Sequence, residues 1–209
     1  MVASSILASR TDYMAYKKDW SDYYAATRSK PPRDLLVKAL SHLLKKKDQK
    51  AIDIGGGALR DTIFLLHEGF DVTVLDKSPL VDKEADKIKN EKLHIFISSF
   101  EEFVFPKDEY DIASAMYALP FCNPEHFSLV MENIKQSLKI GGIFCGQFFG
   151  DRDQWSSDEK MTFLNKDQAQ EIISDFETIS FTEEEKDDKT AAGDTKHWHI
   201  FNFIVRKIK

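Results

Sequence analysis

The sequence has little cysteine and no long hydrophobic run. Its 209 residues include only Cys122 and Cys145, which we expect to be free thiols of a reducing compartment. No Cys or His pair has the spacing of a structural zinc site, so no metal is expected. No stretch approaches about 18 apolar residues, which predicts no membrane span. Residues 1–8 form a short apolar stretch, but no basic region precedes it and Arg10 interrupts it. We therefore expect no signal peptide and a cytoplasmic location.

Basic residues are also too few for a nucleic-acid-binding surface. Lys and Arg total 29 against 35 Asp and Glu, a net charge of −6, whereas binding to a phosphate backbone needs a basic face. We therefore expect no nucleic-acid partner; the oligomeric state stays open. Hydrophobic residues at 42% and charged residues at 31% are typical of a globular chain. No linker is visible, so we predict a single domain over residues 1–209.

Two helices are expected before the main domain core. Aromatic residues recur at helical steps of three and four within 11–28: Tyr13, Tyr16, Trp20 and Tyr23, with Tyr24 beside the last. The pair Pro31-Pro32 ends this helix, and the leucines that follow predict a second helix to about residue 45. We interpret residues 1–47 as a helical lid or cap and residues 48–209 as an α/β core.

Strands and helices alternate in this core. Apolar runs predict strands at 51–54, 71–75, 92–97, 110–116 and 143–149. Capping signals and periodicity predict helices at 58–68, 78–90, 123–138 and 165–174, with Gly141-Gly142 stopping the third. Two final strands, 176–182 and 197–205, are expected to flank an acidic loop at 183–194. The pattern predicts an α/β fold with a mostly parallel sheet and helices on both faces; one terminal strand runs antiparallel.

Three adjacent glycines, Gly55, Gly56 and Gly57, follow the first predicted strand. Ligands bind at such positions in open α/β sheets, because glycine allows close approach and the next helix N-terminus attracts anions. Arg60 stands where a dinucleotide-binding fingerprint has glycine, and Asp53 would repel a pyrophosphate but suits an ammonium group. An NAD-dependent oxidoreductase is therefore disfavoured, and a cofactor with an amino-acid end is favoured.

Asp76 ends the second predicted strand. A carboxylate there can accept hydrogen bonds from ribose hydroxyls. Its alternative role is to cap the helix that begins near Ser78.

These motifs resemble those of class I S-adenosylmethionine-dependent methyltransferases. The resemblance covers about residues 50–150 and is carried by DIGGGALRDTIFLLHEGFDVTVLDKS, SSFEEFVFPKDEYDIASAMYALPF and IKQSLKIGGIFCGQFFG. It implies a Rossmann-like, seven-stranded sheet, with S-adenosyl-L-methionine as cofactor and S-adenosyl-L-homocysteine as product. The leading WxxYY at Trp20 is similar to the tellurite-resistance-type, small-molecule branch. Leu59 replaces the third glycine of the family loop, and Ser99 replaces an acid that often meets adenine.

The resemblance implies a set of site residues. Expected at the cofactor are Tyr24, Asp53, Gly55, Gly56, Gly57, Arg60, Asp76, Lys77, Ser99, Phe100 and Met116. Asp53 and Arg60 would hold the aminoacyl group, Asp76 the ribose, and Ser99 with Phe100 the adenine. Expected at the acceptor are Tyr117, Phe121, Phe149 and Arg152. The resemblance assigns no catalytic residue.

The expected activity is methyl transfer to a small molecule by in-line displacement, in which the protein positions the reactants and excludes water. Leu59 and Ser99 motivate an alternative, a protein of this fold that binds the cofactor weakly or not at all and is not catalytic. A protein or RNA methyltransferase is a further alternative. His197 and His199 share one face of the last strand and could form a metal pair or a base, but we favour a structural role.

Overall fold

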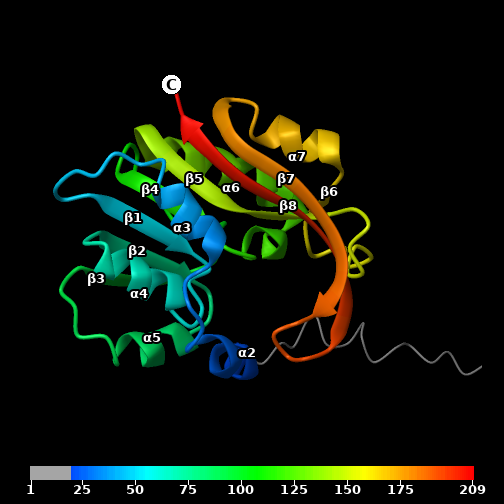
Figure 1. The fold of residues 1–209 in the computed structure, drawn as a ribbon, viewed down its shortest axis with the longest axis horizontal. Helices are drawn as coiled ribbons and strands as arrows, with labels where there is room; N and C mark the ends of the chain where they lie inside the picture. Colours follow the sequence, from blue (N-terminus) through cyan, green and yellow to red (C-terminus); the bar gives the residue numbers. More distant parts are fainter. Residues whose placement is uncertain (1–19) are drawn as a thin grey trace, which may run out of the picture.

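The computed structural model describes residues 20–209, which fold around one mixed sheet (Figure 1). The strand order is β3-β2-β1-β4-β5-β8-β7, with β6 paired to β5. The strands are β1 (Lys50–Ile54), β2 (Asp71–Asp76), β3 (Leu93–Ile97), β4 (Tyr110–Ala115), β5 (Leu138–Gly150), β6 (Phe163–Leu164), β7 (Phe176–Lys189) and β8 (Thr195–Lys207). Every pairing is parallel except those of β8 with β5 and β7. The predicted α/β class and its antiparallel terminal strand are confirmed, and the short β6 brings the sheet to eight strands.

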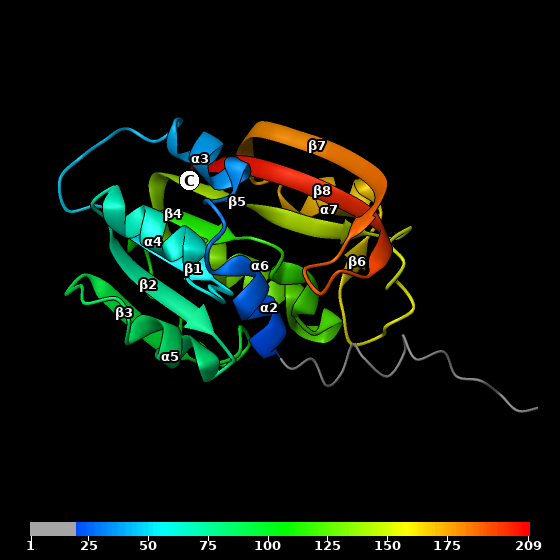
Figure 2. The same ribbon diagram turned by 60° about the horizontal axis from the view of Figure 1, so that its bottom comes forward.

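Helices cover both faces of this sheet. They are α2 (Trp20–Thr27), α3 (Asp34–Leu40), α4 (Arg60–His67), α5 (Leu80–Ala85), the 3-10 turn η1 (Leu119–Phe121), α6 (Pro124–Ser137) and α7 (Lys166–Ile172). One apolar cluster joins the sheet to α3, α4 and α5, and another joins it to α6 and α7. Figure 2 shows α3 and α4 over the same face. No helix among residues 20–209 is long and apolar enough to span a bilayer.

Two helix starts that the sequence predicts are confirmed by side-chain caps. Asn123 accepts a hydrogen bond from the Glu125 N–H (2.9 Å) at the start of α6. Asn165 and Gln168 form a reciprocal capping box at the start of α7. Because each cap lies within three residues of its partner, local sequence was enough to find it.

Several predicted boundaries were wrong. The helix α3 ends at Leu40 rather than near residue 45, and α5 ends at Ala85 rather than near residue 90. Gly141-Gly142 lies inside β5, which begins at Leu138, directly after α6. A Cβ at Gly142 would lie 2.8 Å from the Lys139 carbonyl oxygen, so the glycine there permits an irregular strand rather than stopping a helix. Tyr13 and Tyr16 lie outside the described residues.

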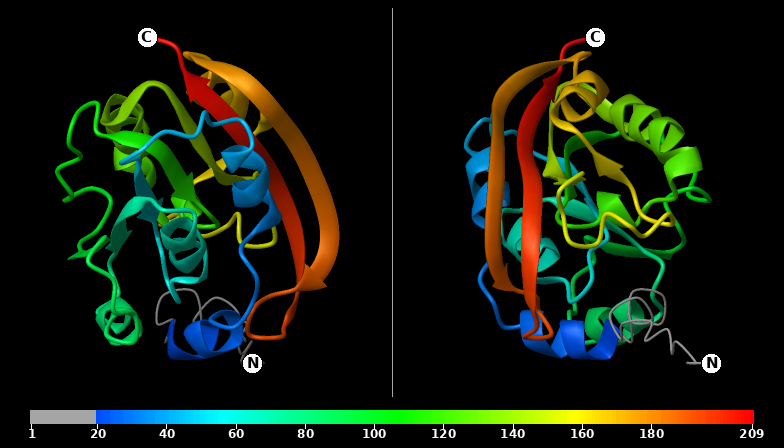
Figure 3. Two further views of the ribbon diagram at one scale, coloured as in Figure 1. Left: turned by 60° about the vertical axis from the view of Figure 1, so that its left-hand side comes forward. Right: turned by 90° about the vertical axis from the view of Figure 1, so that its right-hand side faces the viewer.

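The acidic segment predicted as a loop is instead the second half of β7. In its register, Glu185 is opposite His199 and Asp187 is opposite His197. Cross-strand pairing with oppositely charged groups stabilises a strand that its composition alone would not predict. The resulting β7–β8 hairpin curves along the edge of the sheet, and its turn lies beside α2 (Figure 3).

Candidate functional site

The carboxyl ends of β1, β2 and β4 meet at the glycine loop, which we define as residues 55–59. Gly55 and Gly57 have positive φ angles of 73° and 52°. A Cβ at Gly55 would lie 2.5 Å from the Ala118 Cβ, so only glycine fits there. The loop therefore requires glycine at this position; Gly55 and Gly56 are partly exposed, whereas Gly57 is buried.

Leu59, the departure from the family pattern, is accommodated within the fold. It has φ 62° and ψ 18°, the left-handed region that glycine adopts without strain. Its side chain is fully buried in the cluster formed by α3, α4 and the sheet. It therefore packs inward and does not fill the ligand side of the glycine loop.

Asp76, at the end of β2, stabilises the glycine loop through a hydrogen bond. Its Oδ2 accepts a hydrogen bond from the Gly57 N–H (2.8 Å) and its Oδ1 accepts one from the Ser78 N–H (2.8 Å). Burial raises the pKa of Asp76, against these two hydrogen bonds. The buried Tyr24 hydroxyl lies near Asp76 and Ser78, but in the part of the chain that the structure describes it has no partner with full hydrogen-bond geometry. The helix α5 begins at Leu80 without a side-chain cap, so the alternative role of Asp76 as a helix cap is wrong. Asp76 instead bonds the glycine loop and faces the Tyr24 hydroxyl.

Asp53 is enclosed by its own neighbours. It is 2% exposed and accepts hydrogen bonds from the Thr62 hydroxyl (2.6 Å) and the Ser114 hydroxyl (2.8 Å). Burial, assisted by repulsion from Asp61, raises its pKa to about 6. These bonds tie β1 to α4 and β4, so Asp53 fixes the base of the glycine loop. Its contact with an ammonium group stays a prediction.

Two guanidinium groups share one carboxylate at the start of α4. Arg33 pairs with Asp61 (Nη1 to Oδ2, 2.6 Å), and the Arg60 Nε lies 3.8 Å from Asp61 Oδ1. The Arg60 Nε is buried and has no hydrogen-bond partner within the described residues 20–209. Burial, and then the charge of Arg33, lower the pKa of Arg60. The helix terminus therefore has an excess of positive charge that a bound anion would neutralise.

The N-terminal segment 20–33, called the lid below, lies over the glycine loop. A Cβ at Gly57 would be 3.5 Å from a Tyr23 ring carbon and 3.8 Å from a Tyr24 ring carbon. The Trp20 ring packs edge-on against Phe121, with 5.4 Å between centroids. The lid thus reaches both the glycine loop and the segment that follows β4.

The remaining cofactor candidates lie around this centre, and their roles stay predictions. The segment after β3 is anchored by a hydrogen bond from the Ser98 N–H to the Asp76 carbonyl (3.1 Å). Ser99 accepts a hydrogen bond from the Glu102 N–H (3.3 Å), and Phe100 packs against the core while partly exposed. Lys77 is exposed, whereas Met116 is buried.

Three of the acceptor candidates lie together and one does not. Tyr117, Phe121 and Phe149 belong to one aromatic cluster with Trp155 and Trp198. Tyr117 has φ 58°, and its N–H donates to Gln147 Oε1 (3.0 Å). Arg152 instead binds to the β7–β8 hairpin, where its Nη2 donates to Glu183 (2.9 Å) and Glu185 (2.8 Å) of β7. We therefore leave Arg152 out of the acceptor region proposed below.

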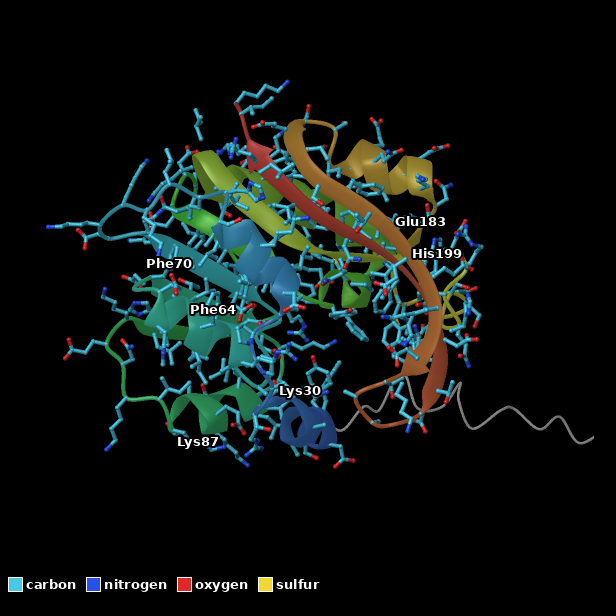
Figure 4. All side chains as sticks on the ribbon, viewed as in Figure 1. Lys30, Phe64, Phe70, Lys87, Glu183 and His199 are labelled. Carbon is cyan, nitrogen blue, oxygen red and sulfur yellow. The ribbon has the colours of Figure 1, made fainter. Side chains whose placement is uncertain are left out.

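Both C-terminal histidines are held by carboxylates. His197 contacts Asp187 (2.8 Å) and Glu185 (3.1 Å), and the buried His199 contacts Glu183 (3.0 Å). Figure 4 shows Glu183 and His199 beside each other on the hairpin. Among residues 20–209, no group of three or more His, Cys, Asp or Glu could hold a metal ion. These contacts support the structural role we favoured.

Arg33 and Lys196 are the residues that sequence reasoning missed. Lys196 is 2% exposed, pairs with the buried Asp153, and has its Nζ 3.6 Å from the Trp198 ring centroid. Its partner is 43 residues away, and the Asp61 partner of Arg33 is 28 residues away. No local signal marks such residues, because tertiary packing brings their partners together.

Comparisons with known proteins agree on one family. The family described as "Tellurite resistance protein TehB" matches residues 15–188. The crystal structure of TehB from Haemophilus influenzae is similar with a TM-score of 0.72 and 18% identity, over 90% of this chain and 67% of that one. None of the curated proteins matches the chain significantly.

Two further solved structures have the same fold. For 1,6-didemethyltoxoflavin-N1-methyltransferase from Burkholderia thailandensis, solved with S-adenosylhomocysteine, the TM-score is 0.65 and the identity 18%, over 99% and 94% of the two chains. For a phosphoethanolamine N-methyltransferase from Haemonchus contortus the TM-score is 0.68 and the identity 16%, over 97% of this chain and 61% of that one.

Proposed function

The chain belongs to the TehB family, and from this premise we propose that it is an S-adenosylmethionine-dependent methyltransferase with a small-molecule acceptor. One observation carries the proposal. The glycine loop lies between Asp76 and the guanidinium groups of Arg33 and Arg60. Two buried polar atoms beside it, the Tyr24 hydroxyl oxygen and Arg60 Nε, have no hydrogen-bond partner among residues 20–209. Buried polar groups rarely stay unsatisfied in a native protein, so these two atoms favour a bound ligand.

The residues present fit this cofactor. Each Asp76 oxygen accepts one hydrogen bond, and a carboxylate oxygen can accept a second, which leaves capacity for two ribose hydroxyls. The excess positive charge of Arg33 and Arg60 over Asp61 suits the aminoacyl carboxylate. We further propose that the partly exposed Phe100 stacks on adenine and that Ser99 forms a hydrogen bond with it.

The cofactor supplies an already activated methyl group on a sulfonium. The protein therefore has to bind, orient and shield the reactants rather than activate a leaving group. The lid covers the glycine loop with Tyr23 and Tyr24, which limits the entry of water. Aromatic faces also stabilise a nearby cation.

The acceptor region is proposed to lie at Tyr117 and Phe121, where the segment after β4 meets Trp20. The side chains there are mostly aromatic and Trp20 of the lid packs against Phe121, which favours a small acceptor over a macromolecular one. The name of the family makes tellurite one acceptor to assay, beside small nitrogen, sulfur and oxygen nucleophiles.

Calorimetry with S-adenosylhomocysteine tests the cofactor assignment. We expect Asp76→Ala to bind S-adenosylhomocysteine more weakly than the wild type by about 1–3 kcal/mol, the scale of hydrogen bonds to a charged group. Asp71→Ala is the matched control, because Asp71 lies at the other end of β2 and pairs with His94 (2.8 Å). Equal affinity of wild type and Asp76→Ala would contradict the role of Asp76. Binding without methyl transfer to any acceptor would favour the non-catalytic alternative.

A further inference from the structure

Arg33 connects three segments of the candidate site. Its side chain is 16% exposed, and its Nη1 and Nη2 donate to Asp61 Oδ2 (2.6 Å) and the Tyr23 hydroxyl (2.8 Å). Its backbone N–H donates to the second Asp61 oxygen (2.8 Å). Its guanidinium carbon lies 5.3 Å from the centroid of the Tyr117 ring, a cation–π distance.

Each of these partners has a different place in the site. Asp61 lies in the first turn of α4, directly after the glycine loop. Tyr23 lies on the lid, and its ring is the nearest neighbour of the Cβ that Gly57 lacks. Tyr117 follows β4 in a left-handed conformation and is held by Gln147. Arg33 is thus the point at which the lid, the cofactor loop and the acceptor segment meet.

We propose that Arg33 is a positioning residue that holds the lid closed over the glycine loop and fixes Tyr117 at the acceptor side of the same site. This inference rests on the proposed function, because it assigns Arg33 to methyl transfer without placing it on the reacting atoms. The guanidinium suits the task, since its planar fork of donors serves two partners while its face stacks on a third. A lysine at this position would serve one partner as a point charge.

A neighbouring arginine provides a matched control. Arg28 is also a lid residue and pairs with Glu84 of α5 (3.1 Å); the Arg28 side chain is 46% exposed and that of Glu84 is 11% exposed. Because solvent screens the Arg28 end of this pair, it should contribute less than the Arg33–Asp61 pair. By contrast, Asp61 is 3% exposed, so loss of Arg33 would leave a buried carboxylate without its main partner.

The experiment compares Arg33→Gln, Tyr23→Phe and Arg28→Gln with the wild-type chain. Hydrogen–deuterium exchange without ligand reports lid opening at residues 20–33, and calorimetry reports the Kd for S-adenosylhomocysteine. We expect Arg33→Gln to speed exchange in the lid and to raise this Kd about tenfold, the loss of one charge-assisted hydrogen bond. Tyr23→Phe removes only the hydroxyl bonded to Arg33, so it should also speed lid exchange. It keeps the proposal testable if Arg33→Gln does not fold. Arg28→Gln removes a lid contact that is more exposed to solvent, so its effect on lid exchange and on the Kd should be clearly smaller than that of Arg33→Gln.

A chemical rescue separates positioning from a general loss of stability. In Arg33→Ala, added guanidinium at millimolar concentration should restore part of the affinity, whereas an equal concentration of sodium should not. Unchanged lid exchange in both Arg33→Gln and Tyr23→Phe, or equal effects of Arg28→Gln, would overturn the proposal. A wild-type chain that does not bind S-adenosylhomocysteine would contradict the proposed function, and the ligand-free exchange would still decide the role of Arg33.

Discussion

Leu59 combines a strained backbone with a well-packed side chain. Its φ of 62° is unfavourable for a branched residue, but its side chain is fully buried in the α3–α4 cluster. Left-handed backbone costs an ordinary residue about 1–2 kcal/mol. Truncating a buried leucine costs about 2–5 kcal/mol. The packing term is therefore the larger, which explains how this chain tolerates a loop without the third glycine.

We predict that Leu59→Gly destabilises the protein by about 1–4 kcal/mol, because the lost packing exceeds the relief of strain. Asp48→Gly is the control, since Asp48 has a similar φ of 56° but is exposed. That change should be neutral or stabilise the protein by up to about 1 kcal/mol. Urea unfolding of both variants measures these changes. A more stable Leu59→Gly would show that strain dominates at this position.

At the scale of elements, the far end of the β7–β8 hairpin is held by a buried ion pair. Lys196 on β8 and Asp153 in the segment after β5 have side chains that are 2% and 0% exposed. The Lys196 Nζ also lies 4.2 Å from the Trp155 ring centroid and 4.9 Å from that of Phe149. The pair thus fixes the aromatic cluster beside Tyr117 as well as the hairpin itself.

We predict that Lys196→Met destabilises the protein by about 3–5 kcal/mol, because it leaves the Asp153 charge buried and unpaired. The double variant Lys196→Met/Asp153→Leu should recover most of this loss, since it removes both charges. Lys186→Met is the control: Lys186 is 46% exposed where it pairs with Glu184, and its loss should cost under about 1 kcal/mol. Denaturant unfolding of the four proteins tests the prediction. A double variant no more stable than Lys196→Met would show that the aromatic contacts, not the buried charge, matter here.

The elements also show which features could be predicted from sequence. The β–α alternation and the caps at Asn123 and Asn165 depend on neighbours a few residues apart, and they were found. The second half of β7 was missed because its carboxylates are paired across the sheet with His197, His199 and Arg152. The sequence motif was enough to locate the glycine loop and Asp76. The role of Arg33 could be recognised only from its tertiary contact with Asp61. Long-range pairing of charges is what a single sequence conceals.

Over the whole molecule, two groups of carboxylates respond to pH in opposite directions. On the hairpin, hydrogen bonds from His199, Lys166 and Arg152 lower the pKa of Glu183 to about 2, and those from Arg152 and His197 lower that of Glu185 to about 2. Such groups stabilise the fold above their unfolded pKa near 4.5, and this contribution is lost as pH falls toward 2. Asp53 behaves oppositely, because burial raises its pKa from 3.8 to about 6.

The sign for Asp53 follows from proton binding. Between pH 3.8 and about 6 the folded state holds a proton that the unfolded state has released, so stability falls as pH rises through this window. The full effect corresponds to about 3 kcal/mol.

We therefore predict that Asp53→Asn, which cannot ionise, gains stability relative to wild type between pH 4 and pH 7, by up to about 3 kcal/mol. Glu183→Gln is the control with the opposite sign, since its deficit should shrink only as the pH falls below about 4.5. Urea unfolding at a series of pH values measures both differences. Parallel curves for wild type and Asp53→Asn would mean that the hydroxyls of Thr62 and Ser114 offset the burial of the charge completely.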